Sequence, residues 1–402
     1  DKPKDILAAQ VSVPVRKIEE IKPVAVITTP SGETVLDMGQ NMVGWLRFAV
    51  EGEAGTVVTI KHAEVLDKEG NFYTENLRSA KQTIQYTLKG QGLEVFEPHF
   101  TFQGFRYVKV EGYPGSLSLD NFTGIVIHSD MEQTGSFKCS DELVNQLQHN
   151  ILWGQKGNFL DVPTDCPQRD ERLGWTGDAQ VFIRTASFNM NTASFFTKWL
   201  KDLKSDQLDN GGVPYVIPHV LNENSHSSAA WGDAATVCPW TIYLCYSDRR
   251  LLEEQYESMK SWVEYIKSQG PDEYLWNTGF HFGDWLGLDS KEGSYFGATS
   301  NDYIATAFYA YSTSLVVKAA KILGKEEDAK KYEELHSNIL KAFRKEFVTP
   351  NGRIASPTQT AHVLALMFDL LEEKDRERAI KTLVEYLEET KYHLTTGFVG
   401  TP

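Results

Sequence analysis

The fold is decided around residues 140–151, SDELVNQLQHNI, where the spacing of apolar residues changes along the chain. An N-cap signature at residues 140–142 precedes Leu143, Leu147 and Ile151, which recur at helical intervals. Before this stretch apolar residues alternate with polar ones, and after it they recur in steps of three and four. The sequence therefore predicts a strand-rich N-terminal part and a helical C-terminal part.

The N-terminal part predicts short strands separated by turn residues. Ile84, Tyr86 and Leu88 alternate with polar residues, which is the period of a half-buried strand. Glycine, proline, asparagine and aspartate separate such runs about every ten residues, which is typical of an antiparallel β-sandwich. We place this domain at residues 1–135. Further strands are expected at residues 44–50, 57–63, 105–110 and 124–128.

Aromatic residues are concentrated between Phe96 and Tyr107. They could form a platform for a carbohydrate, but aromatic side chains also dominate protein cores. Core packing of the sandwich is the favoured interpretation.

The C-terminal part predicts about nine helices between residues 140 and 392. The clearest apolar stripes lie at residues 252–266, 304–315 and 332–343, and the second helix ends at Gly324 with a glycine cap. The helices follow one another in pairs with no fixed-period repeat, which favours a closed α/α toroid over a solenoid. We place this domain at residues 136–402. No glycine-rich nucleotide loop follows a strand.

Bulk composition narrows the classes of partner. A chain of 402 residues is too long for one compact core, and its 41% hydrophobic and 24% charged residues are ordinary for a globular protein. The net charge of −15 argues against nucleic acid as a partner, because that would require a clustered basic face. No apolar run has the length that spans a bilayer, so no membrane partner is expected.

The cysteines show no metal-binding spacing. We expect free, partly buried thiols at all four positions, with a Cys166–Cys238 disulfide as the alternative in an oxidising compartment. The four positions are Cys139, Cys166, Cys238 and Cys245.

One loop, residues 161–178, DVPTDCPQRDERLGWTGD, concentrates the chemistry. Its prolines and glycines prevent a regular helix. So many ionisable groups beside an indole indicate a polar ligand or a proton transfer. The groups are Asp165, Arg169, Asp170, Glu171, Arg172, Trp175 and Asp178.

Two later loops, residues 208–233 and 270–300, repeat the combination of indoles and carboxylates. A pyranose needs both, because its C–H faces stack on aromatic rings while its hydroxyls donate to charged acceptors. The sequence therefore predicts a sugar site, with no metal ion and no catalytic role for His226 or His281. The loops supply His226, Trp231, Asp233, Trp276, His281, Asp284, Trp285 and Tyr295.

Hydrolysis of a glycoside requires one protonated carboxylic acid and a second carboxylate. We select Glu171 as the acid. Neighbouring carboxylates favour the protonated form of Glu171, whereas Arg169 and Arg172 favour its ionised form. If Arg169 pairs instead with Asp165 or Asp170, the field that remains on Glu171 favours protonation. The alternative is an ion-pair network that only anchors the loop, with Asp178 as the N-cap of a helix at residues 178–190.

The segment from Asp165 to Asp178 resembles the signature of the bacterial α-L-rhamnosidases, glycoside hydrolase family 78. Segments 37–45, 73–78 and 100–107 are similar to the β-sandwich domain that precedes the catalytic domain of that family. Segments 231–240, 283–285 and 395–402 are similar to its later landmarks. The resemblance thus covers nearly the whole chain.

The resemblance implies an (α/α)6 barrel that hydrolyses terminal α-L-rhamnose with inversion and without a cofactor. By motif position Glu171 would be the general acid. The general base of the family is a glutamate in a motif downstream of the Thr-Gly-Phe segment, and the chain ends at Pro402 before such a motif. Nine helices also fall short of the twelve in such a barrel, so we expect an incomplete catalytic domain that lacks the water-activating carboxylate and is inactive or very weakly active. Asp165, Arg169 and Asp178 would bind sugar hydroxyls, and Trp175, Trp231 and Trp285 would line the rhamnose pocket.

Two other functions stay open. One is a different enzyme on an α/α toroid, either a glucosidase or a polysaccharide lyase. A lyase needs a tyrosine or histidine base with a cation that neutralises a uronate, and these loops are too rich in carboxylates for that. The other is a carbohydrate-binding module without catalysis. A bacterial periplasmic or secreted location is favoured, with a cytoplasmic one open.

Overall fold

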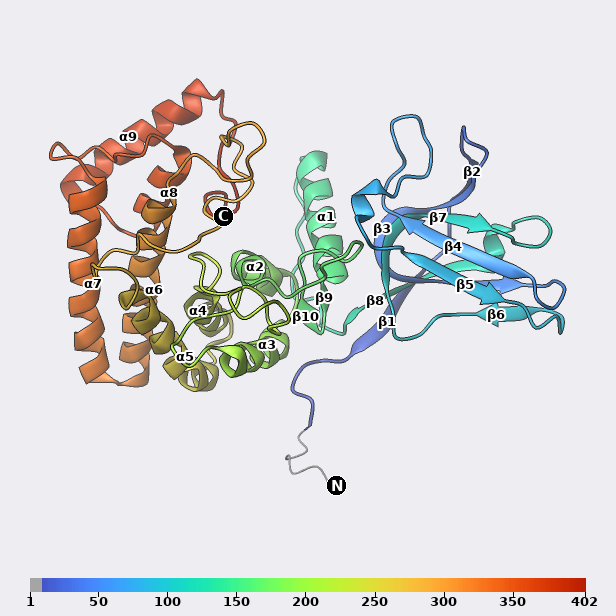
Figure 1. Cartoon of the computed structure of the whole chain (residues 1–402), viewed down its shortest axis with the longest axis horizontal. Coiled ribbons are helices and arrows are strands. Elements are labelled where there is room, and N and C mark those ends of the chain that lie inside the picture. The colour runs from blue at the N-terminus through green and yellow to red at the C-terminus, as the bar shows by residue number, and fades with distance from the viewer. Residues whose placement is uncertain (1–8) are drawn as a thin grey trace. The chain divides into compact units, whose positions relative to one another are not determined.

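The computed structural model describes residues 9–402, which form two compact units (Figure 1). The sheet unit comprises the described residues up to Gly174 together with Phe188–Phe195. The helical unit comprises Trp175–Ser187 and Phe196–Pro402. The sheet unit therefore contains the strands, the first helix and most of the loop that concentrates the charged residues.

All strand pairs of the sheet unit are antiparallel, which confirms the predicted antiparallel pairing. One hydrogen-bonded sheet runs in the order β1-β8-β3-β7-β4-β5, and β2 and β6 also pair with β3. Side chains of β5 alternate between exposed and partly buried, as the period of two predicted. The strands are β1 Val15–Ile21, β2 Ala25–Thr28, β3 Thr34–Val50, β4 Val57–Ala63, β5 Thr83–Thr87, β6 Glu94–Phe96, β7 Gln103–Glu111 and β8 Phe122–Ser129.

The long strand β3 organises the core of this sheet. Its register on β7 shifts between Asp37 and Met42, and from Gly44 onward it also pairs with β8. Gly44 has φ 153°, and a Cβ there would lie 1.8 Å from the carbonyl oxygen of Ile125, so only glycine allows β8 to approach. The buried core residues come mainly from β3, β4, β7 and β8, and include Leu36, Leu46, Phe48, Ile60, Phe105, Val108 and Phe122.

Helix α1, Glu142–Asn158, forms where the N-cap signature predicted it. The Asp141 carboxylate caps it by accepting hydrogen bonds from the backbone N–H groups of Leu143 and Val144, at 2.8 and 3.3 Å. Its C-terminal end packs on the sheet, where a Cβ on Gly157 would lie 2.8 Å from a methyl group of Val43. The predicted apolar stripe is exposed at its start, since Leu143 is 82% and Leu147 57% exposed.

Nine α-helices lie in residues 9–402, as the periodicity predicted. The stripe of α5 is fully buried, as is most of that of α6 and α7. Helices α6 and α7 pack on each other and are joined at Gly324, whose φ of 75° confirms the predicted cap. The helices after α1 are α2 Thr176–Asn189, α3 Ala193–Asp206, α4 Ala234–Tyr246, α5 Arg249–Lys267, α6 Asn301–Leu323, α7 Glu326–Phe347, α8 Gln359–Met367 and α9 Glu373–Glu389.

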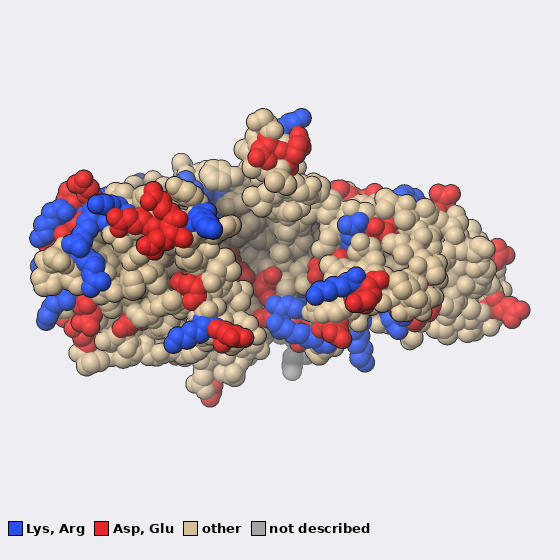
Figure 2. Space-filling view, turned by 90° about the horizontal axis from the view of Figure 1, so that it is seen from above, with Lys and Arg blue, Asp and Glu red and all other residues tan. Residues whose placement is uncertain are grey.

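The surface charges and the free cysteines are as the sequence predicted. On the face seen in Figure 2, acidic and basic side chains are interspersed over both units, and no broad basic patch forms among the described residues there. All four cysteines are free thiols. No helix within residues 9–402 combines the length and the hydropathy needed to cross a membrane.

Candidate active site

The charged loop begins with a tight hairpin of β9, Phe159–Leu160, and β10, Val162–Pro163, in the sheet unit. The loop then closes on itself. The backbone N–H of Asp165 donates to the carbonyl oxygen of Leu173 at 3.1 Å, and the N–H of Leu173 donates to Asp165 Oδ1 at 3.0 Å. This closure holds residues 165–173 as one compact loop.

Inside this loop Arg169 joins two of the predicted carboxylates. Its Nη2 lies 3.6 Å from Asp165 Oδ2, and its Nη1 donates to Glu171 Oε2. A second guanidinium reaches Glu171 from the segment after η1, Glu75–Leu77, where Arg78 Nη1 lies 3.1 Å from the same Oε2. Arg169 therefore contacts Glu171 as well as Asp165, so the sequence-based condition that Arg169 pairs with Asp165 or Asp170 instead of Glu171 is not met.

Burial and backbone strain also mark this cluster. Burial raises the pKa of the Asp165 carboxyl above its usual range. Glu171 and Arg172 have positive φ values of 121° and 54°, which side chains other than glycine rarely adopt. Such strain persists only where surrounding contacts enforce it, and it is concentrated at functional sites. One enforcing contact is the hydrogen bond of 3.0 Å from Arg172 Nη1 to the carbonyl oxygen of Phe102.

The side chains of Asp165, Cys166 and Glu171 offer possible metal ligands within 4.8 Å of one another. Burial, with a smaller contribution from the hydrogen bond to Asp165, raises the pKa of the Cys166 thiol to about 12, so this sulfur stays protonated at neutral pH. The guanidinium of Arg169 already forms ion pairs with both carboxylates, and that of Arg78 with Glu171. The cluster therefore fits a carboxylate–guanidinium network rather than a cation site.

In the helical unit the three predicted tryptophans converge on one ring, Phe282. Its ring centre lies 5.7 Å from Trp175, 4.6 Å from Trp231 and 5.9 Å from Trp285. Tyr215 completes the cluster at 5.0 Å from Phe282. Sequence reasoning missed Phe282, because nothing in the local pattern distinguishes it from a core phenylalanine.

The three indoles differ in exposure. Trp175 and Trp285 are half-buried, whereas Trp231 is 3% exposed and lies against Phe282 and Phe398. Trp231 therefore supports the cluster from within, and the rings of Trp175 and Trp285 are the more accessible ones.

Replacing Gly177 by alanine should disturb this cluster. The new methyl group would lie 2.6 Å from Cε2 of Trp231, and its nearest atoms all belong to that rigidly packed indole. We expect a loss of about 1–3 kcal/mol in the free energy of unfolding from overpacking, measured by urea titration. The control is Gly154→Ala in α1, where no atom lies within 4 Å and alanine favours the helix. Equal stability of both variants would contradict the rigid placement of Trp231.

Two buried aspartates hold the loops that carry these rings. Asp284 is 1% exposed and accepts hydrogen bonds from Thr360 Oγ1 at 2.5 Å and from three backbone N–H groups. Those N–H groups belong to Gly397, Val399 and Gly400, at 2.8, 3.0 and 3.2 Å, and so fix the segment with Phe398.

Asp233 is likewise structural. Its carboxylate accepts from Trp262 Nε1 at 2.9 Å, Ser312 Oγ at 2.5 Å and the backbone of Ala230 at 2.7 Å, which fixes the loop of Trp231.

The two loop histidines form hydrogen bonds within the helical unit. Nδ1 of His281 accepts from the N–H of Ala229 at 3.0 Å and its Nε2 donates to the carbonyl oxygen of Thr278 at 3.0 Å, so the ring is neutral. Burial lowers the pKa of His281 to about 4. Nδ1 of His226 lies 2.7 Å from the hydroxyl of Ser227.

This depressed pKa makes stability depend on pH. Between pH 6.5 and about 4 the unfolded chain binds a proton that folded His281 does not, so stability should fall as the pH drops through that window. The expected contribution is about 3 kcal/mol, measured by urea unfolding at several pH values. His281→Gln keeps both hydrogen bonds without titrating and should make the dependence shallower, with the remainder due to other buried histidines such as His62, whereas His149→Gln at an exposed position should not. The same slope in both variants would exclude His281 as a source.

Asp178 lies in the first turn of α2, which begins at Thr176. The predicted helix start at Asp178 was two residues late, so Asp178 is inside the helix and is not its N-cap. A carboxylate in a first turn is still stabilised by the positive end of the helix dipole.

Comparison with known proteins decides the family. Residues 132–402 match the domain described as the bacterial alpha-L-rhamnosidase 6 hairpin glycosidase domain, and residues 27–128 match the bacterial alpha-L-rhamnosidase concanavalin-like domain. The chain belongs to the bacterial α-L-rhamnosidases. The predicted order of a sheet domain followed by a helical glycosidase domain is confirmed.

Proteins named α-L-rhamnosidase match this chain over its whole length. A curated Streptomyces avermitilis protein named alpha-L-rhamnosidase is 45% identical over 403 residues, which cover 100% of this chain and 38% of that protein. The crystal structure of Streptomyces avermitilis alpha-L-rhamnosidase complexed with L-rhamnose has a TM-score of 0.93 at 44% identity, covering 98% of this chain and 37% of that one. The structure of native alpha-L-rhamnosidase from Aspergillus terreus has a TM-score of 0.96 at 42% identity, covering 100% and 47%. The chain spans 38% and 40% of the length of two curated α-L-rhamnosidases.

Proposed function

We propose that this chain carries the proton donor of a glycoside hydrolase that removes terminal non-reducing α-L-rhamnose from glycosides or polysaccharides. The observation that carries the proposal is the position of Glu171, at a strained backbone position in a closed loop of a chain of the rhamnosidase family. Arg169 and Arg78 hold its side chain in place. The names of the relatives, and the L-rhamnose bound to one of them, support the substrate class.

The proposed chemistry is an inverting acid/base hydrolysis. Glu171 gives its proton to the glycosidic oxygen while the bond from that oxygen to C1 of rhamnose breaks. A water molecule attacks C1 from the opposite face and loses a proton to a second carboxylate, to which we assign no residue of this chain. Asp165, Arg169 and Asp178 are proposed to hold sugar hydroxyls through charge-assisted hydrogen bonds.

Trp175, Trp231 and Trp285 are proposed to form the apolar side of the rhamnose pocket, together with Phe282. Rhamnose has a methyl group at C6 where most hexoses have a hydroxyl, and a C–H surface of this kind packs well on aromatic rings. The half-buried rings of Trp175 and Trp285 would contact the sugar, and Trp231 would fix their shared partner, Phe282.

The domain plan that goes with this function is also a proposal. We infer a sheet domain at residues 1–135 and an (α/α)6 toroid as the plan of residues 136–402, with no cofactor. The matched ranges at residues 27–128 and 132–402 support the division, and the packing of consecutive helices from α4 to α7, and of α8 on α9, supports the toroid.

A product analysis tests the proposed function. The full-length gene product is mixed with 4-nitrophenyl α-L-rhamnoside, and the first sugar released is followed by proton NMR. We expect β-L-rhamnose first, and no release from the matching glucoside or glucuronide. Release of α-L-rhamnose first would refute inversion, and preference for another glycoside would refute the substrate class.

A further inference from the structure

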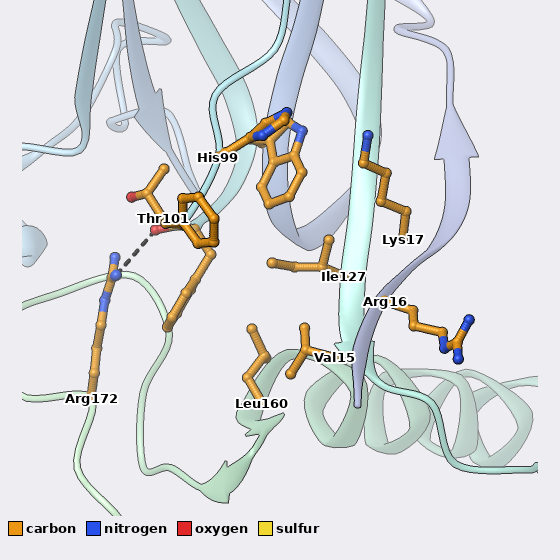
Figure 3. A pocket seen from close by; sticks show the side chains of 11 residues that line it. Val15, Arg16, Lys17, His99, Thr101, Ile127, Leu160 and Arg172 are labelled. Atoms are coloured by element: carbon orange, nitrogen blue, oxygen red, sulfur yellow. Dashed lines mark hydrogen bonds between the residues drawn. The ribbon is translucent and has the colours of Figure 1, made fainter. Parts of the chain in front are cut away.

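A cavity of about 630 Å³ opens in the sheet unit (Figure 3). Its lining includes the aromatic residues Trp45, His99, Phe100 and Phe102. Lys17 on β1 and Arg172 enter it from two sides, with Ile127 and Leu160 between them. The volume is in the usual range for small-ligand sites.

The apolar walls of this cavity are fixed by their own packing. Trp45 is 7% exposed and forms a small core with Ile125 and Ile127, against which Phe102 and Leu160 pack. The indole Nε1 donates to Glu97 Oε1 at 2.9 Å, which sets the orientation of the Trp45 ring. The guanidinium of Arg172 lies 4.3 Å from the centre of the Phe102 ring. The cavity is therefore preformed.

Phe100 stands apart from these fixed walls. Its side chain is fully exposed, at 105%, and its φ of 57° is a strained value for an aromatic residue. Core packing explains Phe105, which is 0% exposed, but it cannot explain Phe100. The ring lies 6.3 Å from His99, which in turn lies 6.5 Å from Trp45, so a row of rings leads into the cavity. An exposed, strained ring at a preformed cavity indicates a ligand contact.

The charged side chains that line the cavity indicate the charge of its ligand. Among the described residues that line it, Arg16, Lys17 and Arg172 are basic and none is acidic. Lys17 forms an ion pair with Glu97 and lies 5.9 Å from the Trp45 ring centre, so its ammonium stands over the indole. Arg16 pairs with Asp130 at 3.2 Å and is 64% exposed.

We propose that this cavity binds a pyranose that carries a carboxylate, as part of an acidic oligosaccharide. The C–H face of the sugar would stack on the exposed ring of Phe100, beside the wall that Trp45 forms, and its carboxylate would accept a hydrogen bond from Lys17. Arg172 would add positive charge from the other side of the cavity. The sheet unit would thereby hold an acidic segment of a polysaccharide, independently of any hydrolysis by Glu171.

Calorimetric titration with the full 402-residue chain tests the proposal. The probes are the trimer of α-1,4-linked galacturonic acid and its fully methyl-esterified form, which keeps the rings and removes the charge. We expect tighter binding of the acid, with a preference that weakens as salt is raised. Phe100→Ala should weaken binding of both probes by at least about fivefold. Lys17→Gln should weaken only the acid.

The control is Phe137→Ala, which removes a 53% exposed ring elsewhere in the sheet unit and should leave binding unchanged. Equal affinity for acid and ester, unchanged binding by the Phe100 variant, or no saturable binding would each overturn the proposal. Light scattering that shows self-association abolished by Phe100→Ala would overturn it too, by identifying a second copy as the occupant. All these measurements record binding or mass, so failure here leaves the hydrolase proposal untouched.

Discussion

Glu171→Gln should lower kcat/KM for an alkyl α-L-rhamnoside by a factor of about 10² to 10⁴ in the full-length gene product. Glutamine keeps the shape of the side chain but cannot donate a proton to the departing oxygen. The loss should be much smaller for a 4-nitrophenyl rhamnoside, because nitrophenolate leaves without protonation. Steady-state kinetics on both substrates measures the difference.

The control is Glu69→Gln, which alters an exposed carboxylate of the same unit and should leave both rates unchanged. An equal loss on both substrates would mean that Glu171 has another role than acid catalysis. Unchanged function in Glu171→Gln would favour the carbohydrate-binding module that the sequence left open.

Asp284→Ala should be the most destabilising single change considered for this chain, with a loss of about 3–5 kcal/mol in the free energy of unfolding. The substitution removes the acceptor of the Thr360 hydroxyl and of the backbone N–H groups of Gly397, Val399 and Gly400, all in a buried site. Buried donors without an acceptor are costly. Thermal melting should show Tm lower by about 6–10 °C, at about 2 °C per kcal/mol for a unit of this size.

Asp289→Ala is the matched control for this prediction. Asp289 is partly buried in the same loop, and its Oδ1 accepts one hydrogen bond, at 2.9 Å from the N–H of Ala298. Its loss should cost about 1 kcal/mol. A Tm for Asp284→Ala close to that of the control would show that the segment around Phe398 is held by other contacts.

Local sequence patterns predicted the secondary structure well. Most helices and strands bury one face, and the apolar residues of that face recur with the period of the helix or strand. The stripe of α5 and the alternation in β5 illustrate this. The start of α2 was predicted two residues late, because aspartate is a preferred N-cap residue and Asp178 lies just inside the true start at Thr176. The exposed leucines of α1 show that periodicity identifies a helix without saying what covers it.

The candidate site was only partly predictable. The residues of the loop at 165–178 are neighbours in sequence, so their chemistry could be inferred together. Arg78 is 93 residues away from Glu171, and Phe282 is 51 residues beyond Trp231, so their contacts depend on tertiary folding. No local signal distinguishes an arginine that reaches the Glu171 carboxylate from one that faces solvent. Arg78 could only be found by its place in a segment that resembles the family.

The protonated thiol of Cys166 has a consequence for the environments in which this loop can exist. A buried sulfur that is not a thiolate reacts slowly with peroxides, alkylating reagents and disulfides. Cys166 should therefore be a poor target for oxidation within the loop that holds Asp165 and Glu171. The same loop geometry can persist in reducing and in oxidising surroundings.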